Sequence, residues 1–236
     1  MRAAWARTLK KLKDAGHSIR SISLPTTKEA LSAYYVLAPA EASSNLAKYD
    51  SVRYGSRPED DGTNSGLLFS RARRQGFGEE VRRRILLGAY TLSADAIDNY
   101  FIQAQKVRRL VQRDFDQNFD LPNVLIEPAE EQHQKSNGVD VIICPTAPDV
   151  PPLLDDIRLH RSPVDAYADD VFTVPASLAG IPAVSVPVAS TSAPSTEDLA
   201  SHNIGIQVIT QYGDDRLALK VAQEIEELEN AAQDRK

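Results

Sequence analysis

Apolar positions along the chain alternate between a helical and a strand spacing. The first segment, MRAAWARTLKKLKDAG, has apolar residues at helical spacing before Gly16, which predicts a core helix with a glycine stop. Ile19, Ile22 and Leu24 bracket a short segment that ends at Pro25, which is typical of a strand. Residues 26–50 open with threonine and place a glutamate in the first turn, which indicates a helix start, and we expect Pro39 to interrupt this helix.

The middle of the chain has a polar segment followed by a long segment with apolar residues at helical spacing. Residues 56–66, SRPEDDGTNSG, are rich in turn formers and predict an exposed loop. Residues 67–119 have the periodicity of a long helical stretch. Residues 121–138 contain two prolines and a charged run, so we interpret them as a surface insertion.

The last third returns to strands separated by helices. The pattern predicts strands in VDVIICP, IPAVSVPVA and NIGIQVIT, a short helix in DDVFTVPASLAG and a closing amphipathic helix in DDRLALKVAQEIEELENAA. Apolar strands with helices between them predict an α/β fold with a mixed β-sheet covered by helices. We therefore expect one domain over residues 1–230, followed by a frayed polar tail at 231–236.

Composition narrows the classes of function. The 236 residues are 42% hydrophobic, enough for a substantial core, and the net charge of −6 leaves no basic stripe for direct binding of nucleic acid. One cysteine and four scattered histidines predict neither an internal disulfide nor a metal site, and they fit a reducing compartment. No apolar run approaches the roughly 18 residues of a membrane span.

Five stretches spread over nearly the whole chain stand out as motifs, namely YYVLAPAEASSNLAKYDSVRYG, GFGEEVRRRILLGAYTLS, QKVRRLVQRDF, ICPTAP and DDVFTVPASLAGIPAVSVP. In sequence and in order they resemble the amidase signature family. The first two are similar to the branch of the family that supplies ammonia from glutamine to a tRNA-dependent amidotransferase. The chain departs from the family pattern at 121–138 and in STSAPSTEDLASHN, as organellar, fungal-like members do.

The resemblance implies that the catalytic residues lie elsewhere. Enzymes of this family hydrolyse amides with a lysine and two serines, which sit in a Gly/Ser-rich stretch in the first half of the family's sequence. This chain has no Gly-Gly pair, and its adjacent serines, Ser43 and Ser44, are out of order with every other motif. We therefore expect the C-terminal half of an amidase domain, with no catalytic residue of its own and no activity in isolation.

The resemblance also implies a pocket for free glutamine. An amino acid offers an α-carboxylate and an α-ammonium, for which an arginine fork and a carboxylate are natural partners. By position in the matched motifs, Arg84 would hold the carboxylate and Asp170 the ammonium. Tyr34 would complete the pocket.

The residues alone suggest other roles for the same side chains. Consecutive Arg82, Arg83 and Arg84 on a helix point in different directions, so two of the three are expected to be solvated or paired on the surface. Capping of the following helix is the role that the sequence favours for Asp169 and Asp170. By default the tyrosine pair is half-buried, Cys144 is inert core, and the remaining polar residues of the first motif bond to surrounding loops, namely Glu41, Ser43, Ser44 and Asn45.

For cofactors and partners, the resemblance implies a heterotrimer. A partner B subunit would use ATP and Mg to activate Glu-tRNA(Gln), a small third subunit would complete the complex, and tRNA would meet this chain only through the complex. We expect no cofactor in the chain itself, and a location in the mitochondrial matrix with the cytoplasm as the alternative. Other functions left open are a non-catalytic interaction module and an amidase for other small amides, although a simple amide has no zwitterion for Arg84 and Asp170 to bind.

Overall fold

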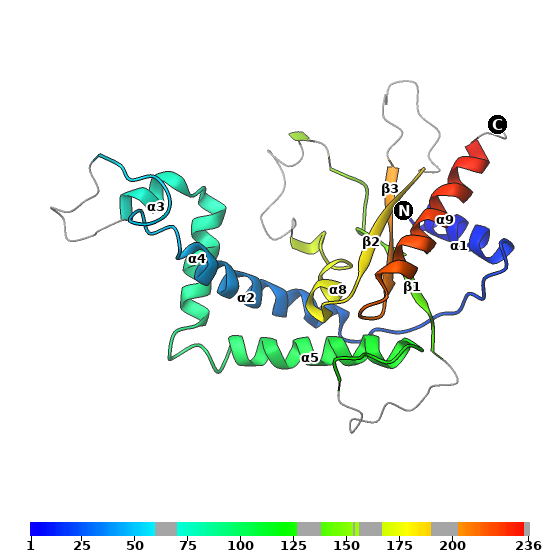
Figure 1. Ribbon diagram of the computed structural model, residues 1–236, viewed down its shortest axis with the longest axis horizontal. Helices are drawn as coiled ribbons and strands as arrows, with labels where there is room; N and C mark the ends of the chain where they lie inside the picture. The colour runs from blue at the N-terminus through cyan, green and yellow to red at the C-terminus, as the bar shows by residue number, and fades with distance from the viewer. Residues whose placement is uncertain (60–69, 127–137, 153, 156–166, 190–202, 234–236) are drawn as a thin grey trace. The chain divides into compact units, whose positions relative to one another are not determined.

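The computed structural model describes residues 1–59, 70–126, 138–152, 154–155, 167–189 and 203–233 (Figure 1). The chain forms two compact units, unit 1 from Met1–Leu31 and Arg108–Lys236 and unit 2 from Ser32–Val107. In chain order the helices and strands are α1 (Arg2–Asp14), α2 (Thr27–Leu46), α3 (Ser70–Gly76), α4 (Glu79–Thr91), α5 (Phe101–Asn118), β1 (Val141–Pro145), α8 (Val174–Ala179), β2 (Ala183–Ala189), β3 (Asn203–Thr210) and α9 (Asp215–Gln233). None of the helices in these ranges is long and apolar enough to cross a membrane.

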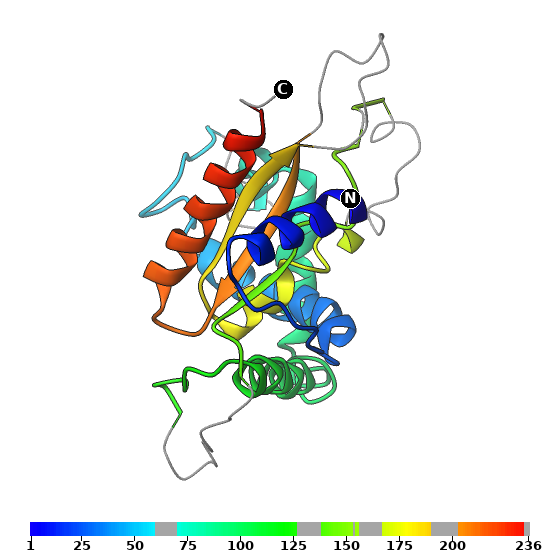
Figure 2. The same cartoon turned by 90° about the vertical axis from the view of Figure 1, so that its right-hand side faces the viewer.

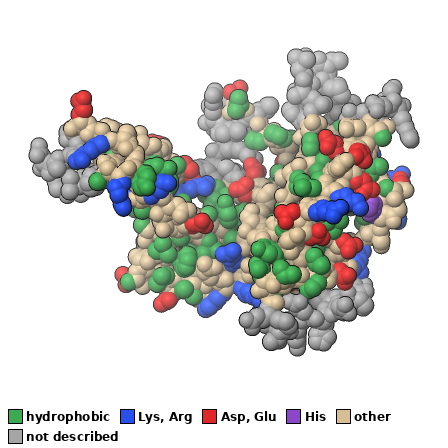
Figure 3. Space-filling model, viewed as in Figure 1, with side chains coloured by type: hydrophobic (Ala, Val, Ile, Leu, Met, Phe, Trp, Pro, Cys, Tyr) green, Lys and Arg blue, Asp and Glu red, His purple; other side chains and the backbone are tan. Residues whose placement is uncertain are grey.

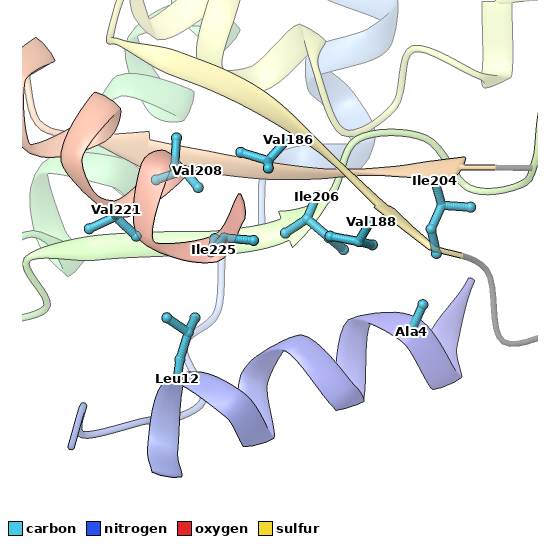
Figure 4. Close-up of a cluster of buried hydrophobic side chains, with 10 residues drawn as sticks. Ala4, Leu12, Val186, Val188, Ile204, Ile206, Val208, Val221 and Ile225 are labelled. Carbon is cyan, nitrogen blue, oxygen red and sulfur yellow. The ribbon is translucent and has the colours of Figure 1, made fainter. Parts of the chain in front are cut away.

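The sheet of unit 1 has three antiparallel strands in the order β1-β3-β2, so β3 is the central strand (Figure 2). One face of the sheet packs against α1 and α9 (Figure 4). Alternate residues of β2 point into this core, as a strand's period of two requires. The buried apolar cluster consists of Ala4, Leu12, Val186, Val188, Ile204, Ile206, Val208, Val221, Ala222 and Ile225.

The end of α1 shows why a glycine follows it. Gly16 has a φ of +103°, which L side chains rarely adopt. In this geometry the N–H of His17 donates to the carbonyl of Leu12 at 3.1 Å, and the N–H of Gly16 donates to that of Lys13 at 3.0 Å. These two bonds satisfy the last carbonyls of the helix, so the predicted glycine stop is confirmed.

Ion pairs join α1 to α9. Glu229 is only 6% exposed, and its Oε1 accepts a hydrogen bond from Lys11 Nζ at 2.9 Å, while Arg7 Nη2 lies 3.9 Å from its Oε2. Nearer the surface, His17 Nε2 lies 2.9 Å from Glu224 Oε1. A carboxylate buried to this extent needs such partners, and the basic face of α1 supplies them.

In unit 2, α2 continues through Pro39, so the expected interruption there is wrong. Proline removes one backbone hydrogen bond, but this turn of the helix is buried against α4. A Cβ atom on Gly88 of α4 would overlap the carbonyl group of Pro39 and lie 2.9 Å from Ala40 N. The close approach of the two helix backbones therefore requires glycine at position 88.

Most of the predicted elements are confirmed. The first and last helices, the three later strands and the mixed helix-and-strand fold all agree with the sequence pattern, and the described strands run antiparallel. The helical stretch predicted at 67–119 contains α3, α4 and α5, with turns between α4 and α5. Most of the predicted loop at 56–66 and of the predicted insertion at 121–138 lies outside the described residues, as do the last three residues of the tail.

The strand expected at 19–24 is wrong. Residues 17–24 are neither helix nor strand, and the Ile19 side chain is 40% exposed. A short apolar run becomes a strand only when a neighbouring strand pairs with it, and no described strand pairs with this one.

Candidate functional site

Arg84 lies on α4, one turn after Glu80. Its Nε donates to Glu80 Oε1 at 2.8 Å, and the Arg84 side chain is 39% exposed. Arg83 also contacts Glu80 through Nη2 and is 51% exposed. One carboxylate thus holds two guanidinium groups, and a carboxylate ligand at Arg84 would share that guanidinium with Glu80.

Arg82 differs from its two neighbours. Its side chain is half-buried, and in the described part of the chain its buried Nε has no hydrogen-bond partner. The expectation that two of the three arginines are solvated or paired on the surface is therefore confirmed by Arg83 and Arg84, and Arg82 is the exception. On an α-helix, the neighbouring positions face different surroundings, and only the residue beyond Glu80 by three or four positions can reach its carboxylate.

Tyr34 lies on α2 and is half-buried, as predicted. Its ring packs edge-on against that of Tyr35, with centroids 5.2 Å apart and an interplanar angle of 86°. The expected bonds from this helix to surrounding loops are wrong at two positions: Ser43 Oγ donates to the carbonyl of Ala40 at 2.8 Å, and Asn45 Nδ2 approaches Glu41 Oε1 at 3.5 Å. These groups are satisfied within α2 because serine and asparagine readily bond to the preceding helical turn.

Asp170 lies in the turn of residues 167–173, before α8. The predicted capping role is wrong, because the N-cap of α8 is Thr173, which itself makes no side-chain cap bond. The carbonyl of Asp170 accepts hydrogen bonds from the backbone N–H groups of Thr173 at 3.1 Å and Val174 at 3.0 Å. The backbone of the turn is thus closed by the carbonyl of Asp170.

The sheet of unit 1 reaches this turn through a buried polar side chain. Gln207 Nε2 donates to the carbonyl of Phe172 at 3.1 Å and lies 3.7 Å from Cys144 Sγ. Burial raises the pKa of the Cys144 thiol, and the hydrogen bond from Gln207 lowers it by a smaller amount, so that the resulting pKa is about 11. Cys144 is therefore a neutral thiol at physiological pH, in agreement with the predicted inert role.

Residues 50–54, in the second half of the first motif, form a structured turn that the sequence analysis did not predict. Asp50 Oδ1 accepts the N–H groups of Arg53 and Val52, both at 2.9 Å, and these bonds hold the pKa of Asp50 well below its usual range. Ser51 has a φ of +63°. The signal was present, since an aspartate before a short polar run favours such a turn.

A hollow of about 220 Å³ lies beside this turn, and Tyr49, Ser51, Arg73 and Phe77 are among the residues that line it. The rings of Tyr49 and Phe77 meet edge-on at 6.2 Å. None of the three predicted site residues lines the hollow. Of the described residues that line it, two are aromatic and one is cationic.

The three predicted substrate-binding residues belong to different units. Tyr34 and Arg84 fall in unit 2, and Asp170 falls in unit 1. Their meeting in one glutamine pocket stays a prediction.

Among the described residues, no group of three or more histidine, cysteine or acidic side chains could hold a metal ion. On the face shown in Figure 3, basic and acidic side chains are interspersed.

The antiparallel sheet, its flanking helices and the ordered motifs define the class of protein. The chain belongs to the amidase family, whose family model matches residues 1–219. It is 55% identical to the mitochondrial A subunit of glutamyl-tRNA(Gln) amidotransferase from Coccidioides posadasii, over 97% of this chain and 46% of that protein. The protein of the same name from Tuber melanosporum is 52% identical over 96% of this chain and 45% of its own length.

Solved structures agree with the fold. The crystal structure of the A subunit of glutamyl-tRNA(Gln) amidotransferase from Thermotoga maritima is 31% identical and has a TM-score of 0.58, over 95% of this chain and 38% of that one. A 6-aminohexanoate cyclic dimer hydrolase has a TM-score of 0.61 at 17% identity, which shows the fold alone. The chain spans about half the length of the curated relatives it matches.

Proposed function

We propose that this chain is the glutamine-binding part of an amidotransferase subunit that releases ammonia from glutamine for the conversion of Glu-tRNA(Gln) to Gln-tRNA(Gln). The observation that carries the proposal is the 55% identity to a fungal protein of that name over 97% of this chain. The nucleophile and its lysine base would come from the part of the subunit that this chain does not match.

In this proposal Arg84 binds the α-carboxylate of glutamine, Asp170 binds its α-ammonium and Tyr34 packs against the substrate. Two features of the structure are compatible with these roles. The Arg84 side chain is 39% exposed, so a ligand can reach it, and Glu80 orients it through Nε. Asp170 lies in the turn before α8, three positions ahead of the N-cap Thr173.

We further propose a heterotrimer in the mitochondrial matrix. A partner B subunit would bind ATP, Mg and the acceptor end of Glu-tRNA(Gln), and a small third subunit would complete the assembly. The relatives carry a mitochondrial designation, and the net charge of −6 with interspersed surface charges fits a chain that leaves the tRNA to its partner. A pulldown of the full-length subunit from mitochondria should recover both partners, and recovery of neither would contradict this assembly.

The site is tested by comparing two nitrogen sources in the reconstituted full-length complex. Arg84→Ala should weaken glutamine use by about 2–5 kcal/mol, the cost of removing one partner of a desolvated charge pair. Asp170→Asn should be similarly damaging because the ammonium loses its counter-charge. Both variants should keep amidation with ammonium chloride, since the partner's chemistry is unchanged.

Arg83→Ala is the matched control, because Arg83 lies next to Arg84, contacts the same Glu80 and is more exposed. It should leave both activities near the wild-type level. Arg84→Lys should recover only part of the glutamine activity, since a point charge cannot replace a planar fork. Equal loss of glutamine-dependent and ammonia-dependent amidation in Arg84→Ala and Asp170→Asn would show that these residues maintain fold or assembly, and the proposed site would be wrong.

A further inference from the structure

Gln207 is a buried polar residue at the centre of the sheet of unit 1. It is 4% exposed and lies on β3, where it is paired with Cys144 of β1 on one side and Ser185 of β2 on the other. A polar side chain in a central strand is costly unless its hydrogen bonds are made. What its amide group bonds to is therefore informative.

The amide of Gln207 joins the sheet to the turn of residues 167–173. Its Nε2 donates to the carbonyl of Phe172 at 3.1 Å, and its second contact, with Cys144 Sγ at 3.7 Å, stays within the sheet. Because β3 is paired with a strand on each side, the backbone of Gln207 is held in place. The length of its side chain therefore sets the distance between the sheet and Phe172.

The turn transmits this position to Asp170. The carbonyl of Asp170 accepts the N–H groups of Thr173 and Val174, so the backbone from 170 to 174 is one closed unit that includes Phe172. The far end of α8 is fixed separately, since Arg108 Nε donates to the carbonyl of Leu178 at 2.8 Å. With α8 anchored at its end, a shift of Phe172 moves the start of the unit, where Asp170 lies.

We propose that Gln207 is a positioning residue for glutamine binding, which fixes the turn of residues 167–173 against the sheet and thereby places the Asp170 carboxylate. The inference rests on the proposed function, in which Asp170 binds the substrate ammonium. Gln207 itself does not contact the substrate in this proposal. Its effect is expected on the affinity for glutamine and not on the partner's chemistry.

The test is Gln207→Met in the reconstituted full-length complex. Methionine keeps the length and unbranched shape of glutamine but cannot donate to Phe172. The KM for glutamine should rise about tenfold, the scale of one lost hydrogen bond, with a smaller change in kcat. Amidation with ammonium chloride should stay at the wild-type rate.

Gln211→Met is the matched control. Gln211 is 1% exposed, follows β3 directly, and its Nε2 donates to Asp116 Oδ1 at 3.2 Å and to the carbonyl of Leu121 at 3.3 Å. Its Oε1 also accepts the N–H of Tyr212 at 2.7 Å, so the same substitution removes a buried amide with three bonds but leaves the Asp170 turn untouched. Gln211→Met should lower the melting temperature without raising the KM for glutamine.

A second variant covers the case in which Gln207→Met does not fold. Gln207→Glu keeps the length, and its carboxyl can donate to Phe172 only while it is protonated. Burial moves such a carboxyl toward a pKa of roughly 8–9. The association constant for glutamine can be measured by calorimetry on the full-length subunit and divided by the wild-type constant at each pH. This ratio should fall between about pH 6 and 9.

The possible outcomes separate the inference from the proposed function. If Asp170→Asn raises the KM, three results would overturn the inference alone. They are an unchanged KM in folded Gln207→Met, an equal rise of the KM in Gln211→Met, and a binding ratio in Gln207→Glu that does not depend on pH. An unchanged KM in Asp170→Asn would overturn the proposed ammonium site and this inference with it. A rise confined to Asp170→Asn and the Gln207 variants would support both.

Discussion

Glu80 is the residue that distinguishes the three consecutive arginines of α4. Arg84 and Arg83 both reach its carboxylate, whereas the buried Nε of Arg82 has no hydrogen-bond partner among the described residues. The sequence alone placed Arg84 in a family motif, but it could not show which guanidinium is paired, because pairing depends on rotamers. This is why Arg83, and not Arg82, serves as the solvated control.

Cys144 gives a prediction at the scale of one residue. Its pKa is raised from 9.0 to about 11, chiefly by burial, so at pH 8 the folded state holds roughly a hundredfold less thiolate than the unfolded state. Alkylation by iodoacetamide should be slower in the folded full-length subunit by about that factor. Equal labelling rates in buffer and in denaturant would contradict the buried position.

The same thiol has a defined linkage sign. An acid whose pKa is higher in the folded state favours folding in its neutral form. Its contribution to the free energy of unfolding is therefore fully present below pH 9.0, and it is lost as the pH rises toward about 11. Cys144→Ser should flatten this alkaline part of the stability profile, which denaturant titration at several pH values would measure.

At the scale of elements, the crossing of α2 and α4 depends on one glycine. Gly88→Ala should lower the free energy of unfolding by about 1–3 kcal/mol, because the added Cβ would overlap the backbone of Pro39 and force the two helices apart. Thermal melting of the full-length subunit would measure the loss.

Gly76→Ala is the control for this crossing. Gly76 is the last residue of α3, and a Cβ there would meet nothing within 4 Å. Alanine at this position should be neutral or slightly stabilising, since it reduces the freedom of the unfolded chain. Equal effects of the two substitutions would show that helix propensity, and not the close approach of α2, governs position 88.

Elements were predictable where the pattern is local. The glycine after α1 and the alternation in β2 are encoded in a few neighbouring residues, and both were predicted correctly. The failures depend on distant partners: the run at 19–24 needs a strand to pair with, and Pro39 stays helical because α4 packs against it. For the site, the family motif suggests Arg84 and Asp170, whose roles stay a prediction, and the link through Gln207 joins residues 35 positions apart and leaves no sequence pattern.

At the scale of the whole molecule, the chain exposes large apolar side chains on several elements. The most exposed include Val124 at 76%, Leu86 at 73%, Leu154 at 70% and Leu219 at 62%. In the described sheet, β1 and β2 both have an edge without a paired strand. Since the chain spans about half the length of its relatives, these surfaces are candidates for burial in the full-length subunit.

The 236-residue chain expressed alone should therefore bind a dye specific for apolar surfaces and aggregate, whereas the full-length subunit should not. It should also release no ammonia from glutamine, because the family's nucleophile is not in its sequence. Size-exclusion chromatography, dye fluorescence and an ammonia assay would test this. A soluble monomer with a sharp cooperative melt would contradict the expected exposure.

The contact between α1 and α9 affects how the protein can be made. Lys11 and Glu229 are 218 positions apart, and a ribosome adding about 5–20 residues per second needs roughly 10–40 s to synthesise that interval. During this interval α9 does not yet exist, so the apolar surface around Leu12 is not covered by α9 and Lys11 is not paired with Glu229. A nascent-chain chaperone could cover α1 during this interval.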